Sequence, residues 1–272
     1  MAIITLLTDF GTRDEYAGIL KGVIYGINPA AAIVDLTHAI PPQDVVRAAL
    51  VLKAAWRYFP AGTIHTAVVD PGVGSGRPII AARQNGHWFL APDNGLLSAV
   101  WQEGAPERLV RVENQALFLQ PVSRTFHGRD IFAPVAAHLS LGMAVEELGS
   151  AVHSDEVIRL DLAEPRWIDP DTVVGRIVSV DHFGNLVTNL GAAQMDRLDR
   201  SGDGSGVCIT VGAHCIQGLS SSYAQKPPGK LMAVIGSREV LEIAVNQGSA
   251  AQYVGVGAGD TVQATSGLAG KL

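Results

Sequence analysis

The chain has 272 residues, of which 47% are hydrophobic and 17% are charged, so it can bury a sizeable core and is not expected to be disordered. Its formal net charge of −6 lacks the basic footprint that binding to nucleic acid or to an anionic membrane requires. The opening residues MAIITLLTDFG have no basic segment and their apolar run stops at Thr8, so we expect a cytoplasmic protein with no secretion signal and no membrane span.

Strand-like and helix-like segments alternate over the first 150 residues. Short apolar runs predict strands at residues 2–8, 31–37, 63–70, 78–83 and 87–92. Apolar residues at helical spacing predict helices at residues 15–27, 44–59, 95–102 and 130–141. This alternation predicts a Rossmann-like layered α/β domain with a mostly parallel sheet over residues 1–162. Ligands of such sheets bind beyond the carboxyl ends of the strands, where Asp9 and Asp70 are expected.

From about residue 172 the pattern changes to short β-like runs separated by Gly, Asp, Ser and Pro. These runs are residues 172–181, 185–190, 206–212, 230–236, 239–245 and 260–265. They predict an all-β second domain over residues 172–272, a sandwich or a barrel, in which only residues 191–198 have helical character. The two prolines of AEPRWIDPD indicate a linker at residues 163–171.

The segment VVDPGVGSGR places three glycines between Asp70 and Arg77. A dinucleotide-binding loop needs a helix after its glycines, and a Walker A loop needs Gly-Lys-Ser/Thr. The residues that follow this loop, 78–83, are instead typical of a strand. A phosphate site is therefore disfavoured, and the loop is either a plain glycine-rich turn or a holder of Asp70 and Arg77 for other chemistry.

His127, in the segment TFHGRDIFAP, precedes a predicted helix start. The helix dipole there favours a neutral imidazole, which can accept or relay a proton near neutral pH. Taken alone, a histidine at such a position is more often a capping or packing residue.

Asp9 follows the first predicted strand, in the segment TDFGTRDEYAG. A carboxylate at that place could bind a ribose diol, ligate a metal or cap the next turn. No HxH, HxxxH or DxD spacing groups it with His38, His65, Asp35 or Asp14, so we expect no metal site.

Two segments of the β-rich part, VDHFGNLVTN and IGSREVLEIAVNQGSAA, combine short strands with polar side chains. Each could be a plain hairpin. The polar side chains that they carry include Asp181, Asn185, Asn189, Ser237, Arg238, Glu242 and Asn246. Phe183 could stack on a flat ring.

Six motifs run in order along nearly the whole chain: TDFGTRDEYAGILKG, VVDPGVGSGR, APDNGLL, TFHGRDIFAP, DHFGNLVTN and SREVLEIAVNQGSAA. Together they resemble the S-adenosyl-L-methionine (SAM) hydroxide adenosyltransferases, or SAM hydrolases, which are relatives of the fluorinases and chlorinases. The resemblance implies an N-terminal α/β domain, a C-terminal β-barrel and a homotrimer with substrate at subunit interfaces. It also implies that SAM and water react to give adenosine and L-methionine, without a cofactor.

The resemblance also implies roles for particular residues. The Asp, Arg and His that activate water in that family correspond to Asp70, Arg77 and His127, and its ribose-binding Asp corresponds to Asp9. The positions that match those handling the methionine and nucleoside ends are Asp181, Asn185, Ser237 and Arg238, and those matching apolar walls are Phe126 and Phe183. A lone carboxylate would raise the pKa of a bound water, so we expect Asp70 to orient Arg77, while the identity of the base stays open.

The halogenases differ from this sequence at the expected site. They have Tyr-Ser where this chain has His127-Gly128, a threonine-rich loop in place of DPGVGSGR, a tryptophan at the position of Gln43, and an inserted loop before the APDNG strand. A halide pocket must be dry and apolar, whereas Asp, Arg and His suit water, so hydroxide transfer is favoured over halogenation. The sequence also leaves open a SAM- or adenosine-binding module without catalysis and a metal-dependent hydrolase that uses Asp9, Asp14 and histidine residues.

Overall fold

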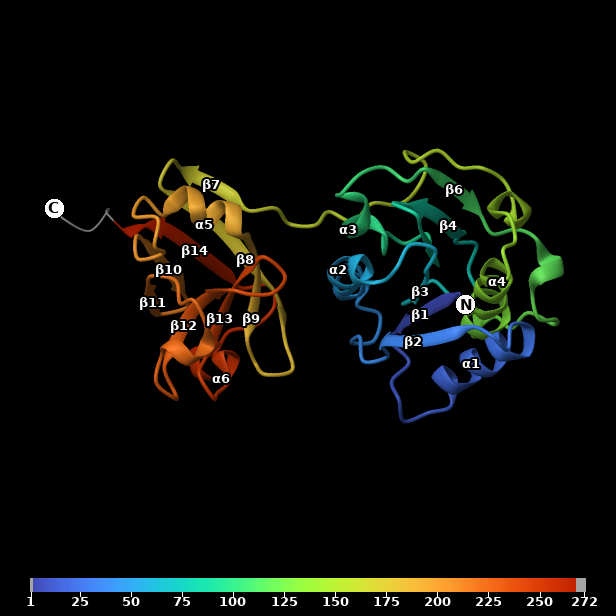
Figure 1. Cartoon of the computed structure of the whole chain (residues 1–272), viewed down its shortest axis with the longest axis horizontal. Helices are drawn as coiled ribbons and strands as arrows, with labels where there is room; N and C mark the ends of the chain where they lie inside the picture. The colour runs from blue at the N-terminus through green and yellow to red at the C-terminus, as the bar shows by residue number, and fades with distance from the viewer. Residues whose placement is uncertain (1, 268–272) are drawn as a thin grey trace. The chain divides into compact units, whose positions relative to one another are not determined.

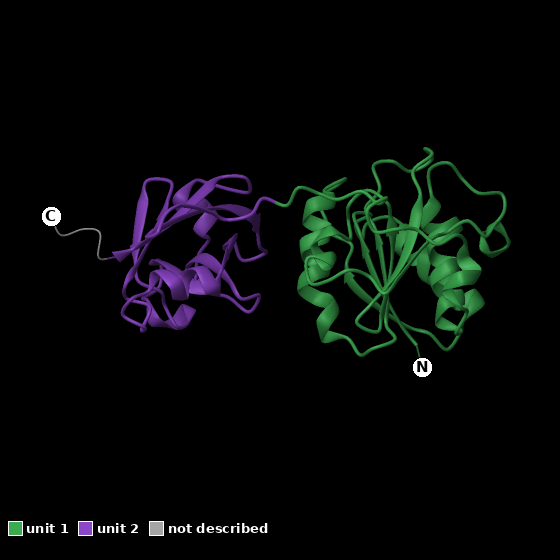
Figure 2. Ribbon diagram, turned by 90° about the horizontal axis from the view of Figure 1, so that it is seen from above, with its two compact units in different colours: residues 1–162 green, residues 163–272 purple. Residues whose placement is uncertain are grey.

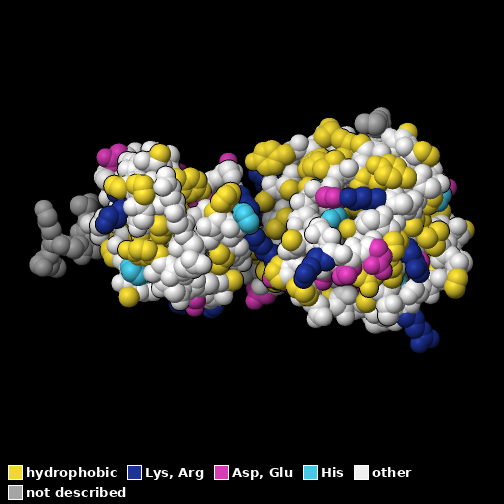
Figure 3. All heavy atoms as spheres, turned by 90° about the horizontal axis from the view of Figure 1, so that it is seen from below, with side chains coloured by type: hydrophobic (Ala, Val, Ile, Leu, Met, Phe, Trp, Pro, Cys, Tyr) yellow, Lys and Arg dark blue, Asp and Glu magenta, His cyan; other side chains and the backbone are white. Residues whose placement is uncertain are grey.

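The computed structural model describes residues 2–267, and the chain divides into two units, residues 1–162 and residues 163–272 (Figure 1, Figure 2). Unit 1 is a sheet covered by helices on both faces, and unit 2 is a barrel-like sheet. Charged side chains of both signs and hydrophobic side chains are intermixed on the face shown in Figure 3. Within residues 2–267, no helix has both the length and the apolar character needed to cross a membrane.

The sheet of unit 1 has six strands: β1 (Ile3–Thr8), β2 (Ala32–Thr37), β3 (Ile64–Val68), β4 (Ile79–Gln84), β5 (His87–Pro92) and β6 (Arg108–Arg111). Their order is β2-β1-β3-β5-β4-β6, and the first four of these are parallel neighbours. The four main helices are α1 (Tyr16–Ile27), α2 (Val45–Ala55), α3 (Ser98–Trp101) and α4 (Ala133–Ser140). The predicted layered α/β class is therefore confirmed.

The remaining two strands depart from the parallel pattern. β4 is antiparallel to both β5 and β6. Asn85 and Gly86 join β4 to β5 with φ angles of 50° and 76°, and two successive positive φ values produce the tight turn that twisted hairpins favour. The sequence pattern does not predict β6, because a strand of four residues with arginine at both ends has too little apolar pattern to be recognised.

Two apolar clusters hold the helices against the sheet. Leu6 belongs to the cluster on the α1 and α4 side, and Leu7 belongs to the cluster on the α2 and α3 side. Both side chains are fully buried, because successive side chains of a strand point to opposite faces and both faces are covered here. This double coverage explains why β1 reads as a continuous apolar run.

Three of the predicted helices differ in the structure: two are shorter, and the third begins with a different type of turn. α2 begins after Asp44, whose side chain accepts the N–H of Arg47 at 2.8 Å, and it ends at Ala55, followed by a 3₁₀ turn over Trp56–Tyr58. The segment predicted as a helix at 95–102 is helical only at Ser98–Trp101. The segment predicted at 130–141 begins with a wide π-type turn at Gly128–Phe132 and continues as α4.

Unit 2 contains the strands β7 (Arg166–Asp169), β8 (Thr172–Val180), β9 (Leu186–Gly191), β10 (Val207–Val211), β11 (His214–Gln217), β12 (Leu231–Ile235), β13 (Val240–Val245) and β14 (Thr261–Ser266), with the helices α5 (Ala192–Leu198) and α6 (Ala250–Val254). The strand order is β11-β10-β14-β8-β9-β13-β12, with every neighbouring pair antiparallel. The N–H of Ser220, just after β11, donates to the carbonyl of Ala233 in β12 at 2.7 Å. This contact nearly closes the sheet into the predicted barrel.

The segment expected to be a linker, residues 163–171, contains a strand. β7 pairs antiparallel with β8. Trp167 packs against the barrel core, and the guanidinium of Arg197 lies 3.8 Å from the centre of its ring. The two prolines flank this strand rather than interrupt it, so their presence does not exclude β structure.

A buried histidine pair lies within unit 1. The hydroxyl of Thr5 lies 2.9 Å from Nδ1 of His65, and Nε2 of His65 lies 3.2 Å from Nδ1 of His87. His65 is fully buried and His87 is 5% exposed. Burial, with a smaller contribution from His87, lowers the pKa of His65 from 6.5 to about 3.

Acid should therefore destabilise the fold through His65. Below pH 6.5 the unfolded chain binds a proton on His65 that the folded chain binds only near pH 3. The free energy of unfolding should fall with decreasing pH in that window, by up to about 1.4 kcal/mol per pH unit from this one group. The free energy of unfolding of His65→Gln, measured with urea at each pH, should change less steeply with pH than that of the wild type. The exposed His153→Gln is the control, and an identical slope for His65→Gln contradicts the prediction.

Candidate active site

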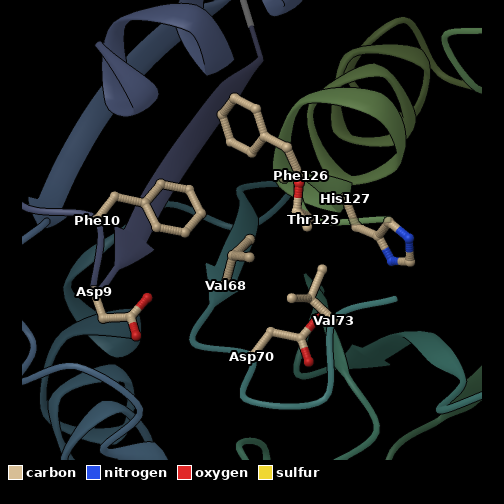
Figure 4. Close-up of a pocket in the computed structure, with 9 residues that line it drawn as sticks. Asp9, Phe10, Val68, Asp70, Val73, Thr125, Phe126 and His127 are labelled. Atoms are coloured by element: carbon tan, nitrogen blue, oxygen red, sulfur yellow. The ribbon is translucent and has the colours of Figure 1, made fainter. Parts of the chain in front are cut away.

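The carboxyl ends of β1 and β3 form one edge of a pocket in unit 1. Thr8 and Val68 are paired in the register of these parallel strands, so Asp9 and Asp70 follow at the same edge of the sheet. The pocket has a volume of about 60 Å³. Its lining residues are Asp9, Phe10, Val68, Asp70, Val73, Thr125, Phe126, His127 and Gly128 (Figure 4).

Asp70 and Arg77 form a buried ion pair within one loop. Nε of Arg77 lies 2.8 Å from each carboxylate oxygen of Asp70, and Nη2 also donates to Oδ2. The side chains are only 5% and 10% exposed, respectively. Both oxygens of Asp70 therefore accept from Arg77, which agrees with an orienting role for this carboxylate.

His127 contacts the same guanidinium from a distant loop. Nη2 of Arg77 lies 3.0 Å from Nδ1 of His127. A guanidinium can only donate, so Nδ1 must carry a lone pair and the proton of the neutral ring sits on Nε2. Burial and then the charge of Arg77 lower the pKa of His127 below its usual 6.5, against the opposing effects of Asp70 and Asp130. The sequence interpretation of a neutral histidine agrees with this environment, although burial rather than a helix dipole is the main cause.

The glycines of the DPGVGSGR loop allow the two loops to meet. Gly74 has a φ angle of +78°, and a Cβ atom built on it would lie 2.1 Å from the carbonyl oxygen of Arg124. Arg124 directly precedes the Thr125–His127 segment of the pocket. Glycine is therefore required at position 74 so that the backbones of the two loops can approach, and the phosphate interpretation is not needed to explain it.

One carboxylate oxygen of Asp9 accepts a backbone hydrogen bond, and the other faces the pocket. Its Oδ2 accepts the backbone N–H of Gln43 at 2.8 Å. Gln43 has a φ of 66°, a conformation that costs free energy for a residue with a side chain. Asp9 faces the pocket in Figure 4, so its second oxygen is available to a ligand hydroxyl.

An aromatic cluster forms the wall beside these charges. The rings of Phe10 and Phe126 are 5.9 Å apart, and the ring of Tyr16 is 5.1 Å from that of Phe126. A Cβ atom at Gly128 would lie 3.2 Å from the Phe10 ring, so glycine there leaves room for Phe10 next to His127. Phe126, expected as an apolar wall, therefore does line the pocket.

Two supporting residues are absent from the sequence-based prediction. Asp130 is 1% exposed, and its Oδ2 accepts the N–H of Ser123 at 2.8 Å, which closes the turn that carries His127. Asn94 of the APDNG motif donates from Nδ2 to the carbonyl of Val69 at 2.9 Å, directly before Asp70. The sequence pattern marks Asp130 only as a helix start, and spacing gives no signal for either long-range contact.

The predicted residues of unit 2 lie in two segments of that unit. In the first, Oδ1 of Asp181 accepts the backbone N–H groups of Phe183 and Asn185, and its Oδ2 accepts from Nδ2 of Asn185 at 2.9 Å. These bonds make a tight turn that leaves the ring of Phe183 75% exposed. A Cβ atom at Gly184, where φ is +84°, would lie 2.1 Å from Oγ of Ser249, so this turn packs against the QGSAA segment.

In the second segment, Ser237 and Arg238 are exposed in the turn that joins β12 to β13. Next to them, a Cβ atom at Gly236 would collide with the carboxylate of Glu242, which is 6% exposed. The phenol of Tyr223 donates to Oε2 of Glu242 at 2.8 Å, and burial, this bond and the charge of Asp181 raise the pKa of Tyr223 to about 12. Tyr223 begins a 3₁₀ turn of three residues (Tyr223–Gln225), which is too short to give a recognisable sequence pattern, so sequence reasoning misses it.

Comparisons with known proteins cover both units. Residues 4–149 match the N-terminal domain of the SAM hydroxide adenosyltransferases, and residues 175–263 match the C-terminal domain of the same family. The chain belongs to the SAM hydroxide adenosyltransferase family. The match includes the pocket of unit 1 and both segments of unit 2 that carry the predicted residues.

Individual relatives match this chain over nearly its full length. A protein of Thermus thermophilus named (R)-S-adenosyl-L-methionine hydrolase is 38% identical over 97% of this chain and 99% of its own length. A fluorinase of Nocardia brasiliensis is 27% identical over 97% of each chain. A crystal structure of an uncharacterised conserved protein from Thermotoga maritima has a TM-score of 0.91, with 37% identity over 96% of this chain and 99% of that chain.

Gly74→Ala should separate the two loops of the pocket. The added Cβ meets the carbonyl of Arg124 and must adopt a positive φ, so the free energy of unfolding should fall by about 2 kcal/mol or more. The contact between Arg77 and His127 should be lost, and with it activity at temperatures where the protein is still folded. Gly76→Ala is the matched control, because its Cβ meets nothing within 4 Å and its φ is not positive. Equal effects of the two substitutions on melting and on activity exclude this role for Gly74.

Proposed function

We propose that this protein hydrolyses SAM to adenosine and L-methionine. The observation that carries the proposal is the Arg77 guanidinium between Asp70 and His127, at an open pocket that also holds Asp9, in a chain of the SAM hydroxide adenosyltransferase family. Relatives that carry the name (R)-S-adenosyl-L-methionine hydrolase at 36–38% identity over nearly the whole chain support the same reaction.

The reaction is a displacement at the C5′ atom of the ribose. The oxygen of water forms the new bond to C5′ while the bond from C5′ to sulfur breaks, and sulfur keeps the electron pair. The sulfonium thus becomes the neutral thioether of methionine, and the water loses one proton, which is released to solvent. The leaving group needs no acid, so catalysis has to act on the attacking oxygen, and no cofactor is required.

We assign to Arg77, which contacts the pocket residues Asp70 and His127, the stabilisation of that oxygen as it loses its proton. A fixed positive charge favours hydroxide over water and lowers the pKa of a bound water. Asp70 holds the guanidinium through both carboxylate oxygens, and His127 accepts from the other side. While this bond persists, Nδ1 of His127 cannot take the proton of the water, and the ring instead offers its Nε2–H as a donor. In-line placement of water, C5′ and sulfur supplies the rest of the rate.

The remaining parts of SAM need further contacts. A pocket of about 60 Å³ is smaller than the roughly 300 Å³ or more of typical ligand pockets, so it holds only the reacting part of the substrate. We assign the ribose diol to Asp9 and the methionine and base ends to Asp181, Phe183, Asn185, Ser237 and Arg238. We further propose a homotrimer with sites at subunit interfaces, for which light scattering in solution gives the mass.

Incubation with SAM and chromatography of the products test the reaction. Adenosine and methionine should appear in equal amounts, with or without a chelator. Arg77→Ala, Asp70→Ala and His127→Ala should each reduce turnover by about 100-fold or more while SAM still binds. Asp9→Ala should instead weaken nucleoside binding by about 10-fold or more. Tight SAM binding without products would indicate a binding module, and 5′-halogenated adenosine in the presence of chloride or fluoride would indicate a halogenase.

The pH profile of the reaction should report on His127. Only the neutral ring can accept from Arg77, and its pKa is lowered, so kcat/KM should fall as the pH drops through a value below 6.5. His127→Asn offers an acceptor near the position of Nδ1 without titrating, so this acid limb should disappear or move to lower pH. His153→Asn, on an exposed histidine, is the control. An unchanged acid limb in His127→Asn would assign it to another group.

A further inference from the structure

A second series of polar contacts begins at Thr8, the residue before Asp9, and leads to the surface. Oγ1 of Thr8 is 2.7 Å from Nδ1 of His38, and Nε2 of His38 is 3.1 Å from Oδ1 of Asp35. Nζ of Lys21 donates to the other oxygen of Asp35 at 2.6 Å. Thr8 is fully buried and His38 is 5% exposed, whereas Lys21 and Asp35 reach the surface.

The charge of Asp35 and the hydroxyl of Thr8 decide which nitrogen of His38 carries the proton. Asp35 is a carboxylate whose pKa burial would raise, but bonds from Lys21 and His38 hold that pKa below its usual value. Nε2 of His38 lies at ion-pair distance from Asp35 without the geometry of a hydrogen bond, and the tautomer with its proton on Nε2 lets Nδ1 accept from the hydroxyl of Thr8. The oxygen of Thr8 is then free to accept the backbone N–H of Phe10, which lies at 3.2 Å.

These groups fix two stretches of backbone against each other. The carbonyl of His38 accepts the N–H of Gly11 at 2.7 Å, and the carbonyl of Thr8 accepts the N–H of Ile40 at 3.4 Å. The first stretch carries Asp9 and Phe10, and the second leads to Gln43, whose N–H holds the Asp9 carboxylate at 2.8 Å. The Thr8–His38 contact therefore ties together both segments that orient Asp9.

We propose that Thr8 and His38 are positioning residues for nucleoside recognition, setting the orientation of the Asp9 carboxylate and the Phe10 ring toward a ribose with an intact diol. The inference rests on the proposed function for the identity of the ligand. Thr8 is fully buried, so it acts through its neighbours and does not touch the substrate.

The same strand offers a matched comparison. Thr5 of β1 is also fully buried and also contacts a histidine, with its hydroxyl 2.9 Å from Nδ1 of His65. Neither Thr5 nor His65 lines the pocket. Removal of the Thr5 hydroxyl therefore reproduces the loss of a buried Thr–His bond without the link to Asp9.

Calorimetric binding of adenosine and of 2′,3′-dideoxyadenosine tests the proposal. The wild type should prefer adenosine, and Thr8→Val should weaken adenosine binding by about 10-fold while changing dideoxyadenosine binding little, since the lost orientation acts on the diol. Thr8→Ser keeps the hydroxyl and should restore the wild-type preference. Thr5→Val should lower the melting temperature and leave the preference unchanged.

A cycle with Asp9→Ala tests whether Thr8 acts through Asp9. In that background Thr8→Val should add little to the loss of adenosine binding, because coupled residues are not additive. If Thr8→Val does not fold, Asp35→Ala at the partly exposed end of this series of contacts serves instead, with an expected loss of about 3-fold in adenosine binding. In the hydrolysis of SAM, the variants that lose the preference for adenosine over dideoxyadenosine should raise KM by a larger factor than they lower kcat.

The outcomes separate the two proposals. Suppose that the wild type hydrolyses SAM, and that Thr8→Val and Thr5→Val prefer adenosine over dideoxyadenosine equally. The positioning role is then wrong and the proposed function stands. If adenosine binding follows the expected pattern but no SAM is consumed, the hydrolytic function is wrong and the positioning role stands. Fully additive losses in the cycle with Asp9→Ala also overturn the positioning role.

Discussion

The guanidinium of Arg77 can neither accept a hydrogen bond nor lose its proton, and the site in unit 1 is arranged around this constraint. Its N–H groups need acceptors, and Nη2 has two of them, Oδ2 of Asp70 and the unprotonated Nδ1 of His127. Asp70 is seven residues away in the same loop, whereas His127 is fifty residues further along the chain. The close backbone approach at Gly74 therefore serves to bring the second acceptor to a cation that the first loop already holds.

The sheet supplies the other half of the arrangement. Parallel strands end at the same edge of a sheet. The residues after β1, β2 and β3 therefore lie close together because of strand pairing alone, whatever their side chains are. Asp9, His38 and Asp70 each follow one of these strands. Helices cover both faces of these strands, and a few short hydrogen bonds orient the polar groups at that edge.

Much of this organisation follows from local pattern, and the rest depends on contacts between distant residues. Apolar runs and helical spacing predict the layered class, the barrel and the strands that end at Asp9 and Asp70, because periodicity is a local property. The antiparallel β4 and the strand within the expected linker depend on pairing partners that periodicity does not name. Motif resemblance indicates Asp70, Arg77 and His127, but the bonds of Asp130, Asn94 and Thr8 join residues seven to thirty positions apart, and no spacing rule relates them.

The charges that surround the pocket do not cancel. The formal charges of Asp70 and Arg77 sum to zero and the histidine beside them is neutral, so the carboxylate of Asp9 gives the pocket a net negative charge, while the N–H groups of Arg77 still act locally on a bound water in the proposed mechanism. A sulfonium ion is attracted to such a site, and a free halide ion is repelled. Hydrolysis removes the positive charge from the nucleoside, since adenosine is neutral. In the proposed reaction, the attraction between this carboxylate and the substrate therefore ends once the bond to sulfur breaks, so the same net charge favours entry of the substrate and departure of the product.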